Sequence, residues 1–373
     1  MAIEIKEVVS SSDIKTFAKF PFEIYKNASF WVPPIIKDEM KMLMPEKNPA
    51  FDFCKAKFWL AFKDGKCVGR IGAIINELYN EKMNEKLGRF SRAEFIDDFE
   101  VSSKLFITAE EWVKKQGMTG IHGPLGFTNL DLQGLLIEGF DYMPSIGSVY
   151  HHPYYLSHFE KAGYIKEIDW IEFRLEQEDN IPPKALKLRD IIKKRAGVEV
   201  LNFTKSSELV PFKKDIFKLL NKAFAELHYV TSFNDKLIEY YSDKYFTLLN
   251  PKFVKIIINQ EKEVVAFIIA LPSLSEAMIK ANGKVFPFGI FHILKAMKHP
   301  KVVDLLLTGV EPQLQSQGIS ALLITELQQT MIDHGVRYVE TTGIFEDNHK
   351  AIQYWKEYNH IQHKRRRCFR KEF

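Results

Sequence analysis

Two stretches of the sequence, one near the end of each half, follow the same layout. Residues 152–175 and 348–373 each begin with a short aromatic helix pattern and continue into strand-like residues. Strands and helices precede both stretches in a similar order. A structural unit that occurs twice in a chain produces this kind of self-similarity. The sequence therefore predicts two copies of one fold in tandem.

A linker separates the two copies. Residues 175–184 read LEQEDNIPPK, a polar and acidic stretch that ends in two prolines and typically interrupts regular structure. A chain of 373 residues also exceeds the usual size of one hydrophobic core. We expect one domain over 1–177 and a second over 185–373.

The second copy alternates strands and helices. The pattern predicts a mixed sheet with helices on its faces, which is an α/β fold of the α+β mixed-sheet type. The expected strands are 198–203, two within 253–272, 302–310, 336–344 and 366–373, and the expected helices are 206–227, 233–247, 319–335 and 348–359.

The bulk composition excludes several classes of protein. A net charge of +4 does not call for nucleic acid, and three widely spaced cysteines fit free thiols better than disulfides or a zinc site. The N-terminus lacks the pattern of an export signal, and no apolar run is long enough to span a bilayer. We expect a cytoplasmic protein, with peripheral contact at the inner membrane face left open.

The stretch at 309–323, GVEPQLQSQGISALL, passes from a strand through a polar loop into a helix. The first amides of a helix have no intrahelical acceptor, and the helix dipole adds partial positive charge there. Such a junction suits a phosphate or pyrophosphate without a metal. Gly318 would let the ligand approach the backbone, and Gln315, Ser316 and Gln317 offer further donors. An ordinary turn that contains a glycine also fits this pattern.

The loop resembles the acyl-CoA site of the GCN5-related N-acetyltransferase (GNAT) superfamily. There, a Val-x-Pro-like step precedes Gln/Arg-x-x-Gly-x-Gly/Ala, and an Asn-x-x-Ala block follows on a later helix. This sequence has Val310-Glu311-Pro312, then Gln315 to Ser320, and later Asn348 with Ala351. Over roughly 198–373, the resemblance implies an acyl-CoA-dependent N-acyltransferase that uses acetyl-CoA or a longer acyl-CoA and no metal. The residues it assigns to the co-substrate are Val310, Pro312, Gln315, Ser316, Gln317, Gly318, Ile319, Ser320 and Asn348.

The catalytic groups are less well defined than the co-substrate site. Attack of an amine on a thioester needs a base and an acid for the leaving thiolate. The superfamily often places a tyrosine seven residues after the Asn, where this sequence has Trp355, which cannot supply that proton. Tyr354 and Tyr358 are the substitutes, although aromatic residues there also fit a core or rim position. The candidates for the base are Glu311, Glu340 and Glu346.

The first copy lacks the features of the phosphate loop. Its corresponding junction, residues 94–112, has no glycine and carries Asp97, Asp98 and Glu100, which would repel a phosphate. We therefore expect this copy to be degenerate for CoA binding and to shape the acceptor cleft or stabilise the pair.

Residues 123–144 form an unusual segment with four glycines and interleaved acids and aromatics. It fits an amine-binding cleft, and it also fits an ordered connecting loop whose glycines satisfy the backbone. His228 lies where this fold builds its substrate side, although a solvated loop histidine is an equal alternative. The candidate cleft residues are Asn129, Asp131, Glu138, Asp141 and His228.

Residues 281–301 are inserted where a compact acetyltransferase needs only a turn. The helix expected there could lie on an anionic membrane, line a channel for an acyl chain or pack against its own domain. The C-terminal HKRRRCFRK could contact an anionic surface or the CoA 3′-phosphate, or form a charged edge strand. The residues expected on one apolar face are Phe286, Ile290, Ile293, Leu294 and Met297, and the lysines gathered at its far end are Lys295, Lys298 and Lys301.

The layout of the whole chain resembles a bacterial two-domain branch of the superfamily that includes bacterial ceramide synthase-like proteins. GPLGF, EGFD, NGK and FPFG together with the late Gln-x-x-Gly loop carry this resemblance. It implies a longer acyl-CoA donor and a lipidic or sphingoid amine acceptor. Two other functions remain open: a transferase of the same fold that uses aminoacyl-tRNA, although a nucleic-acid partner is the less favoured, and a non-catalytic module that binds CoA or lipid.

Overall fold

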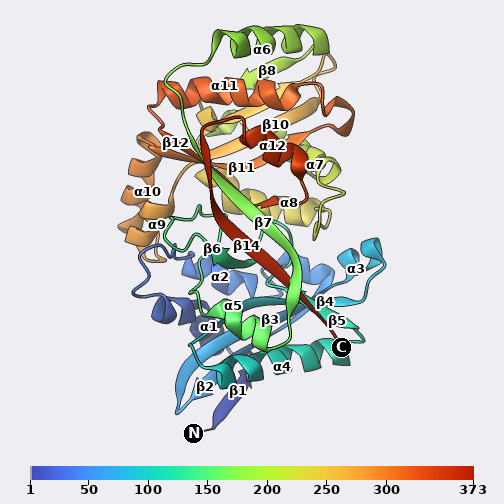
Figure 1. Ribbon diagram of the computed structural model, residues 1–373, viewed down its shortest axis with the longest axis vertical. Helices are drawn as coiled ribbons and strands as arrows, with labels where there is room; N and C mark the ends of the chain where they lie inside the picture. The colour runs from blue at the N-terminus through green and yellow to red at the C-terminus, as the bar shows by residue number, and fades with distance from the viewer. Residues whose placement is uncertain (1) are drawn as a thin grey trace.

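The computed structural model describes residues 2–373, apart from the side chain of Thr247. Its two α/β halves share one continuous mixed sheet that runs the length of the molecule (Figure 1). The strand order is β1-β2-β3-β4-β5-β14-β7-β12-β11-β10-β9-β8. Two short strands lie off this path, with β13 paired to β7 and β6 paired to β14. The predicted α/β class with a mixed sheet is confirmed.

The first half supplies seven strands and five helices. In chain order these are β1 (Ile3–Glu7), α1 (Ser11–Ile24), α2 (Ile36–Met42), β2 (Cys54–Lys63), β3 (Lys66–Asn76), α3 (Glu77–Met83), β4 (Leu87–Phe95), α4 (Phe99–Lys115), β5 (Gly120–Gly123), β6 (Leu135–Glu138), α5 (Tyr155–Lys161) and β7 (Ile165–Glu176).

The second half begins with an additional helix and then repeats the pattern. Its elements are α6 (Pro183–Ala196), β8 (Glu199–Asn202), α7 (Lys213–Ala223), α8 (Asp235–Tyr245), β9 (Val254–Ile258), β10 (Val264–Pro272), α9 (Ser275–Ala281), α10 (Gly289–Lys298), β11 (Val302–Val310), α11 (Ile319–Asp333), β12 (Tyr338–Thr341), β13 (Ile344–Phe345), α12 (His349–Trp355) and β14 (His360–Glu372).

The closing strands of the two halves are exchanged. β14, the last strand of the chain, pairs antiparallel with β5 of the first half, and β7 pairs antiparallel with β12 of the second. β7 and β14 also pair with each other along most of their length. The C-terminus consequently lies beside the first half (Figure 1). The sheet of each half is thus completed by a strand of the other half, and the domain boundaries at 177 and 185 remain a prediction from the sequence.

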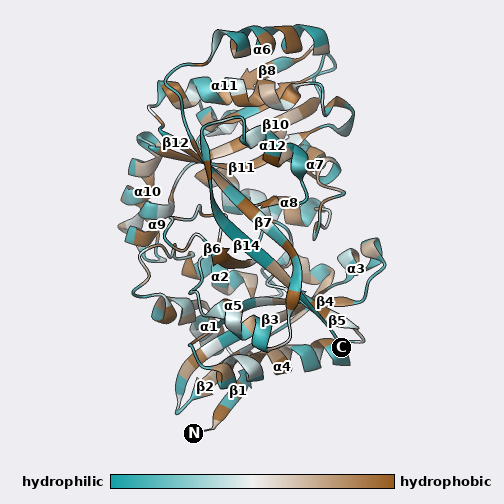
Figure 2. Cartoon of the chain, in the orientation of Figure 1, coloured by the Kyte–Doolittle hydropathy of each residue, from teal (hydrophilic) through white to brown (hydrophobic). Residues whose placement is uncertain are grey.

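Apolar packing also crosses between the halves. One core cluster contains Phe17 and Phe58 of the first half together with Phe217 and Phe267 of the second. Strands β10 and β11 are mostly hydrophobic (Figure 2), because α11 covers one of their faces and the helices α7 and α9 lie against the other. Burial of this surface holds the two halves in a fixed relation.

Two sequence expectations differ from the structure. The helix predicted over 206–227 begins only at Lys213, because Pro211 cannot continue the hydrogen bonding of the preceding turns. The expected single apolar face of 281–301 does not form either. Ile293 is buried, but Phe286 lies outside α10 and Leu294 is 54% exposed. Among the described helices, none is both long and apolar enough to cross a bilayer.

Candidate functional site

The start of α11 has free backbone donors. Gly318 occupies the cap position with φ +88°, and no side chain caps the helix. The first intrahelical bond runs from the N–H of Leu322 to the carbonyl of Gly318 at 3.0 Å. The amides of Ile319, Ser320 and Ala321 therefore have no intrahelical acceptor, and free donors at a helix start suit an anion.

The loop before α11 is exposed and is held by its backbone. Gln315, Ser316 and Gln317 are exposed, and Ser316 adopts a left-handed conformation with φ +64°. The Arg195 guanidinium donates to the carbonyl of Gln317 at 2.8 Å. The side-chain amides of Gln315 and Gln317 donate to the carbonyls of Val310 and Gln313, so the predicted loop residues are held beside the start of α11.

Helix α6 supports this loop, although no functional role was predicted for it from the sequence. A Cβ added to Gly318 would lie 2.7 Å from Cδ1 of Ile192, so α6 packs directly against the loop. The helix is strongly basic, and that composition was the signal that could have identified it. Its cationic residues are Lys184, Lys187, Arg189, Lys193, Lys194 and Arg195.

Strand β12 is short and pairs with only the first part of β11. They are parallel from Val302 to Leu305 on one strand and Tyr338 to Thr341 on the other. Beyond this point β12 ends, while β11 continues to Val310. The hydroxyl of Thr342 donates to the carbonyl of Leu306 at 3.3 Å, at the point where the strands separate. The second half of β11 therefore has an edge without a β12 partner.

Backbone groups of Val310 point towards this open edge. The N–H of Glu311 donates to Val265 of β10 at 2.8 Å. Because backbone groups alternate in direction along a strand, those of Val310 face away from β10. The side chain of Gln315 already donates to the Val310 carbonyl, at 3.4 Å. An extended ligand with amide groups could pair with this edge as an added strand does.

The predicted acid candidates lie together on α12 and just after it. The hydroxyls of Tyr354 and Tyr358 are 3.1 Å apart, and both rings pack with Trp355 against the core of the second half. Burial raises the pKa of each tyrosine, so both remain protonated near neutral pH. Asn348 caps α12 by accepting the N–H of Ala351 at 3.2 Å, and this bond fixes the start of the helix.

The predicted base candidates have different surroundings. Glu311 is partly exposed and lies 3.3 Å from the ammonium of Lys222. Glu346 accepts from Lys166 on β7. Glu340 is buried on β12, where its carboxylate accepts from the Arg174 guanidinium.

Asp304 is a buried acid that was not among the residues predicted from the sequence. It is fully buried on β11, beside Glu340, and it is the last residue but one before the strands separate. Within residues 2–373, neither of its carboxylate oxygens has a hydrogen bond of ordinary geometry, although the Ser273 hydroxyl and the Ile146 N–H lie near enough to lower its pKa in part. Burial, with the neighbouring Glu340 charge, raises the pKa of Asp304 to about 8. A lone acid within the apolar strand VVDLLLTGV was the signal in the sequence.

Further charged groups surround Asp304 on the central strands. Glu340 lies 2.6 Å from Nε2 of His363, and Glu172 accepts from Arg366 at 2.8 Å. Burial lowers the pKa of the Lys364 ammonium to about 8. Asp304, Glu172, Glu340, His363 and Lys364 are together called the central cluster below. Two of its groups, Asp304 and Lys364, have pKa values of about 8.

A segment of the first half, residues 139–148, covers the central cluster. Lys364 donates to the carbonyl of Gly139 at 2.9 Å, and Ser148 donates to Glu172 at 2.7 Å. A Cβ on Gly147 would lie 3.7 Å from Cγ2 of Thr342 and 3.9 Å from Cδ2 of Leu306. This segment therefore lies over the point where β11 and β12 separate.

The five predicted cleft residues contact different elements. Asp131 accepts from Tyr241 of α8 at 3.3 Å, and Glu138 lies 3.4 Å from Arg365 of β14. His228 lies 2.9 Å from Asp347, just before α12. Asp141 is exposed, and Oδ1 of Asn129 is buried without a partner among the described residues. The structure spreads these side chains along the boundary between the halves.

The equivalent positions of the first half are occupied by its own side chains. The carboxylate of Asp98 caps α4 by accepting the N–H of Glu100 at 3.0 Å. Phe95, at the end of β4, donates its N–H to the hydroxyl of Tyr155 at 3.0 Å. Its carbonyl accepts from the hydroxyl of Tyr154 at 2.5 Å. The backbone groups at the start of α4 and at the end of β4 are thus hydrogen-bonded to side chains of the first half.

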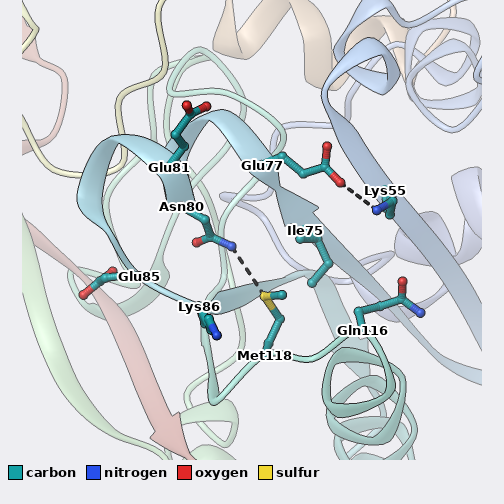
Figure 3. Close-up of a pocket in the computed structure, with 9 residues that line it drawn as sticks. All are labelled: Lys55, Ile75, Glu77, Asn80, Glu81, Glu85, Lys86, Gln116 and Met118. Atoms are coloured by element: carbon teal, nitrogen blue, oxygen red, sulfur yellow. Dashed lines mark hydrogen bonds and ion pairs between the residues drawn. The ribbon is translucent and has the colours of Figure 1, made fainter.

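A separate hollow lies elsewhere, in the first half (Figure 3). It has a volume of about 280 Å³ and is found beside the start of β4 and the end of α4, opposite the N-terminus of that helix. Its charged groups are partly paired, with Lys55 2.7 Å from Glu77. All of its lining residues belong to the first half, and none is part of β11 or β12. The lining residues are Lys55, Ile75, Glu77, Asn80, Glu81, Glu85, Lys86, Gln116 and Met118.

Comparison with known sequences finds a family and two relatives. The pattern of the Acetyltransferase (GNAT) family matches residues 214–359. The chain is 31% identical over 356 residues to "Protein YghO" of Escherichia coli, covering 92% of this chain and 89% of the relative. It is 25% identical over 336 residues to a "Bacterial ceramide synthase" of Caulobacter vibrioides, covering 86% of this chain and 84% of the relative.

Solved structures show a similar fold. A tandem GNAT protein from the clavulanic acid biosynthesis pathway aligns over 100% of this chain and 98% of its own, with a TM-score of 0.58 and 12% identity. A GCN5-related N-acetyltransferase from Sphaerobacter thermophilus aligns over 99% and 95%, with a TM-score of 0.52 and 11% identity. At this identity the similarity concerns the fold alone.

Proposed function

Because this chain belongs to the GNAT superfamily and has its tandem organisation, we propose that it is an acyl-CoA-dependent N-acyltransferase with the acyl-CoA site in its second half. One observation carries this proposal. The unpaired edge of β11 begins two residues after the buried acid Asp304, and the uncapped N-terminus of α11 follows this edge in the chain. The first half has neither an uncapped helix start nor an open strand edge at its equivalent positions.

Each part of the site fits one part of acyl-CoA. The free amides from Ile319 to Ala321 would bind the pyrophosphate, with Gln315 to Gln317 as additional donors. The edge of β11 at Val310 would pair with the amides of the pantetheine arm, beside Pro312 and Asn348. The basic residues of α6 would compensate the phosphate charges, and Arg195 already contacts the loop at the Gln317 carbonyl.

The reaction would occur where β11 and β12 separate. The nitrogen of a neutral amine forms a bond to the thioester carbonyl carbon, and the carbon–sulfur bond then breaks. Asp304, when ionised, can accept the proton that the amine loses, because its pKa of about 8 lies close to a neutral working pH. The hydroxyl pair Tyr354 and Tyr358 can supply a proton to the leaving thiolate.

The proposed acceptor is a lipidic amine, with either a sphingoid or another long-chain backbone. The relative named as a bacterial ceramide synthase covers most of the chain and supports this choice. Segment 139–148 and the insertion that holds α9 and α10 both pack over the separated strands, so they would enclose such an acceptor. The acceptor would then be bound between the two halves.

Calorimetric titration with acetyl-CoA and with palmitoyl-CoA tests the donor site. We expect binding of at least one of them, with higher affinity for the longer chain if the acceptor is a lipid. Mass spectrometry of reactions with sphinganine and with short amines then tests the transfer. Failure of both titrations would refute the proposal, and binding without any acyl-amine product would favour a non-catalytic CoA-binding module.

A further inference from the structure

The insertion between β10 and β11 exposes a dense group of large apolar side chains. Phe286 and Phe288 are each 75% exposed, Phe291 is 67% exposed and Leu294 is 54% exposed. They lie close together in the chain around the start of α10, at the outer edge of the molecule beside β11 and β12 (Figure 1). Single exposed apolar residues are common, but a contiguous group usually marks a binding surface.

The same segment is exclusively basic. Between Glu276 and Asp304 the sequence contains no acidic residue. None of its lysines forms an ion pair within the described part of the chain, and all of them are exposed. These residues are Lys280, Lys284, Lys295, Lys298 and Lys301. Together with Phe286, Phe288, Phe291 and Leu294, they are called the α10 surface below.

The α10 surface stands on a well-packed base. Ile293 is 2% exposed and packs with Leu271, Leu274 and Met278. Val32 and Ile35 of the first half join the same cluster. Phe291 and Leu294 therefore project from a packed helix, and Phe286 and Phe288 lie in the segment that leads directly into it.

We infer that the α10 surface docks the protein on an anionic lipid bilayer. Aromatic side chains that project from a helix end, surrounded by unpaired lysines, match the acyl boundary and the anionic headgroups of a membrane. A second copy of this chain fits less well, because a two-fold contact would bring the lysines of both copies together. The lysine charge likewise disfavours any partner surface that is not acidic.

Docking of this kind would bring the proposed active site to the membrane. Leu306, at the separation of β11 and β12, packs against the cluster formed by α9 and α10. A lipidic amine could then pass from the bilayer to the site along the buried side of α10. Only this last step rests on the proposed function; docking itself does not.

Flotation of the full-length protein with vesicles tests the inference. The vesicles consist of phosphatidylcholine alone or of phosphatidylcholine with phosphatidylglycerol, and no acyl-CoA is added. We expect binding to the anionic vesicles only, weakening as salt is raised. The triple variant Phe286→Ser, Phe288→Ser and Phe291→Ser should reduce the bound fraction by about tenfold.

A matched variant removes three other exposed apolar side chains, Ile107→Ser, Ile165→Ser and Val210→Ser, which are 48%, 68% and 62% exposed. It should bind anionic vesicles as the unaltered protein does. Equal binding by the phenylalanine variant, or no binding by the unaltered protein, would overturn the inference. A dimer that the phenylalanine variant dissociates, seen by light scattering, would instead assign the surface to self-association. Calorimetric titration with acyl-CoA in solution tests the proposed donor site without a membrane. A protein that binds acyl-CoA but not vesicles would therefore refute the docking alone.

Discussion

Gly318 is constrained twice, by its own backbone and by its neighbour. Its φ of +88° lies in the left-handed region, and a Cβ there would approach Ile192 to 2.7 Å. Gly335 has a comparable φ of +66°, but a Cβ added there would meet no atom within 4 Å. Alanine substitutions at Gly318 and Gly335 therefore separate the free-energy cost of the left-handed backbone from the cost of the contact with Ile192.

Gly318→Ala should destabilise the protein by about 1–3 kcal/mol and weaken acyl-CoA binding by at least about tenfold, because the loop must shift to relieve the contact. Gly335→Ala should cost about 1 kcal/mol and leave the affinity unchanged. Urea unfolding and calorimetry measure the two quantities. Unchanged acyl-CoA affinity in Gly318→Ala would show that the loop does not bind the pyrophosphate.

The pKa of Asp304 predicts how stability depends on pH, because its folded-state value of about 8 exceeds the ordinary aspartate pKa of 3.8. The folded protein retains a proton that the unfolded chain loses between these values, so this group lowers stability as pH rises from about 4 to about 8. Asp304→Asn removes that contribution. Relative to the unaltered protein, the variant should gain up to about 1.4 kcal/mol per pH unit across this window and nothing further above it. Urea unfolding of both proteins at a series of pH values measures the difference.

The same substitution tests catalysis. We expect Asp304→Asn to lower kcat by about 10²–10⁴ and to abolish the rise of the rate towards pH 8. Glu311→Gln provides the comparison, since Glu311 was a predicted base candidate just after β11 and is paired with Lys222. A large loss of kcat in Glu311→Gln with little change in Asp304→Asn would assign the general base to Glu311 instead of Asp304. Measurement of kcat against pH in both variants decides between them.

At the scale of elements, α4 and α11 occupy equivalent places but begin differently. Asp98 satisfies the first turn of α4 with its carboxylate, whereas α11 has Gly318 and no cap. These differences follow from local sequence, and the glycine-containing loop before α11 and the acidic junction before α4 could both be predicted from a few residues. The separation of β11 and β12 depends on pairings with strands distant in sequence, so no local pattern indicates where it begins.

Asp98→Ala tests the role of the first half. It removes the cap of α4 and the ion pair with Lys63, which should cost about 0.5–2 kcal/mol of stability. Because the first half is proposed to bind no CoA, acyl-CoA affinity should not change. Ser10→Ala, which removes the capping box of α1, provides a comparable loss of a cap. A change of affinity in Asp98→Ala alone would mean that the first half takes part in binding.

At the scale of the whole molecule, the exchanged strands tie the halves together. β14 completes the sheet of the first half at β5, and β7 completes that of the second at β12. A shared core cluster adds to this connection. The two halves should therefore unfold as one cooperative unit, although each has the size of an independent domain.

Cleavage of the linker tests this directly. A protease site introduced within residues 177–182 would cut the chain without touching β7 or α6. After cutting, both fragments should elute together in size-exclusion chromatography and separate only in denaturant. The uncut protein should show a single unfolding transition by circular dichroism and by fluorescence. Fragments that part under native conditions would contradict the exchange of strands.

The sequence alone determined the features that depend on neighbouring residues. The α/β class follows from periodicity, the repeat from similar layouts of two segments, and the loop at Gln315 to Ser320 from a spacing that a helix start imposes. The acid Asp304 was visible as a charge in an apolar strand, but its raised pKa depends on burial beneath residues 139–148 of the other half. Only the tertiary structure decided that environment, and only it decided the exchange of β7 and β14. Strand pairing depends on which apolar faces become buried and on which strand edges find hydrogen-bond partners across the whole chain. The residue spacing within one segment does not determine either.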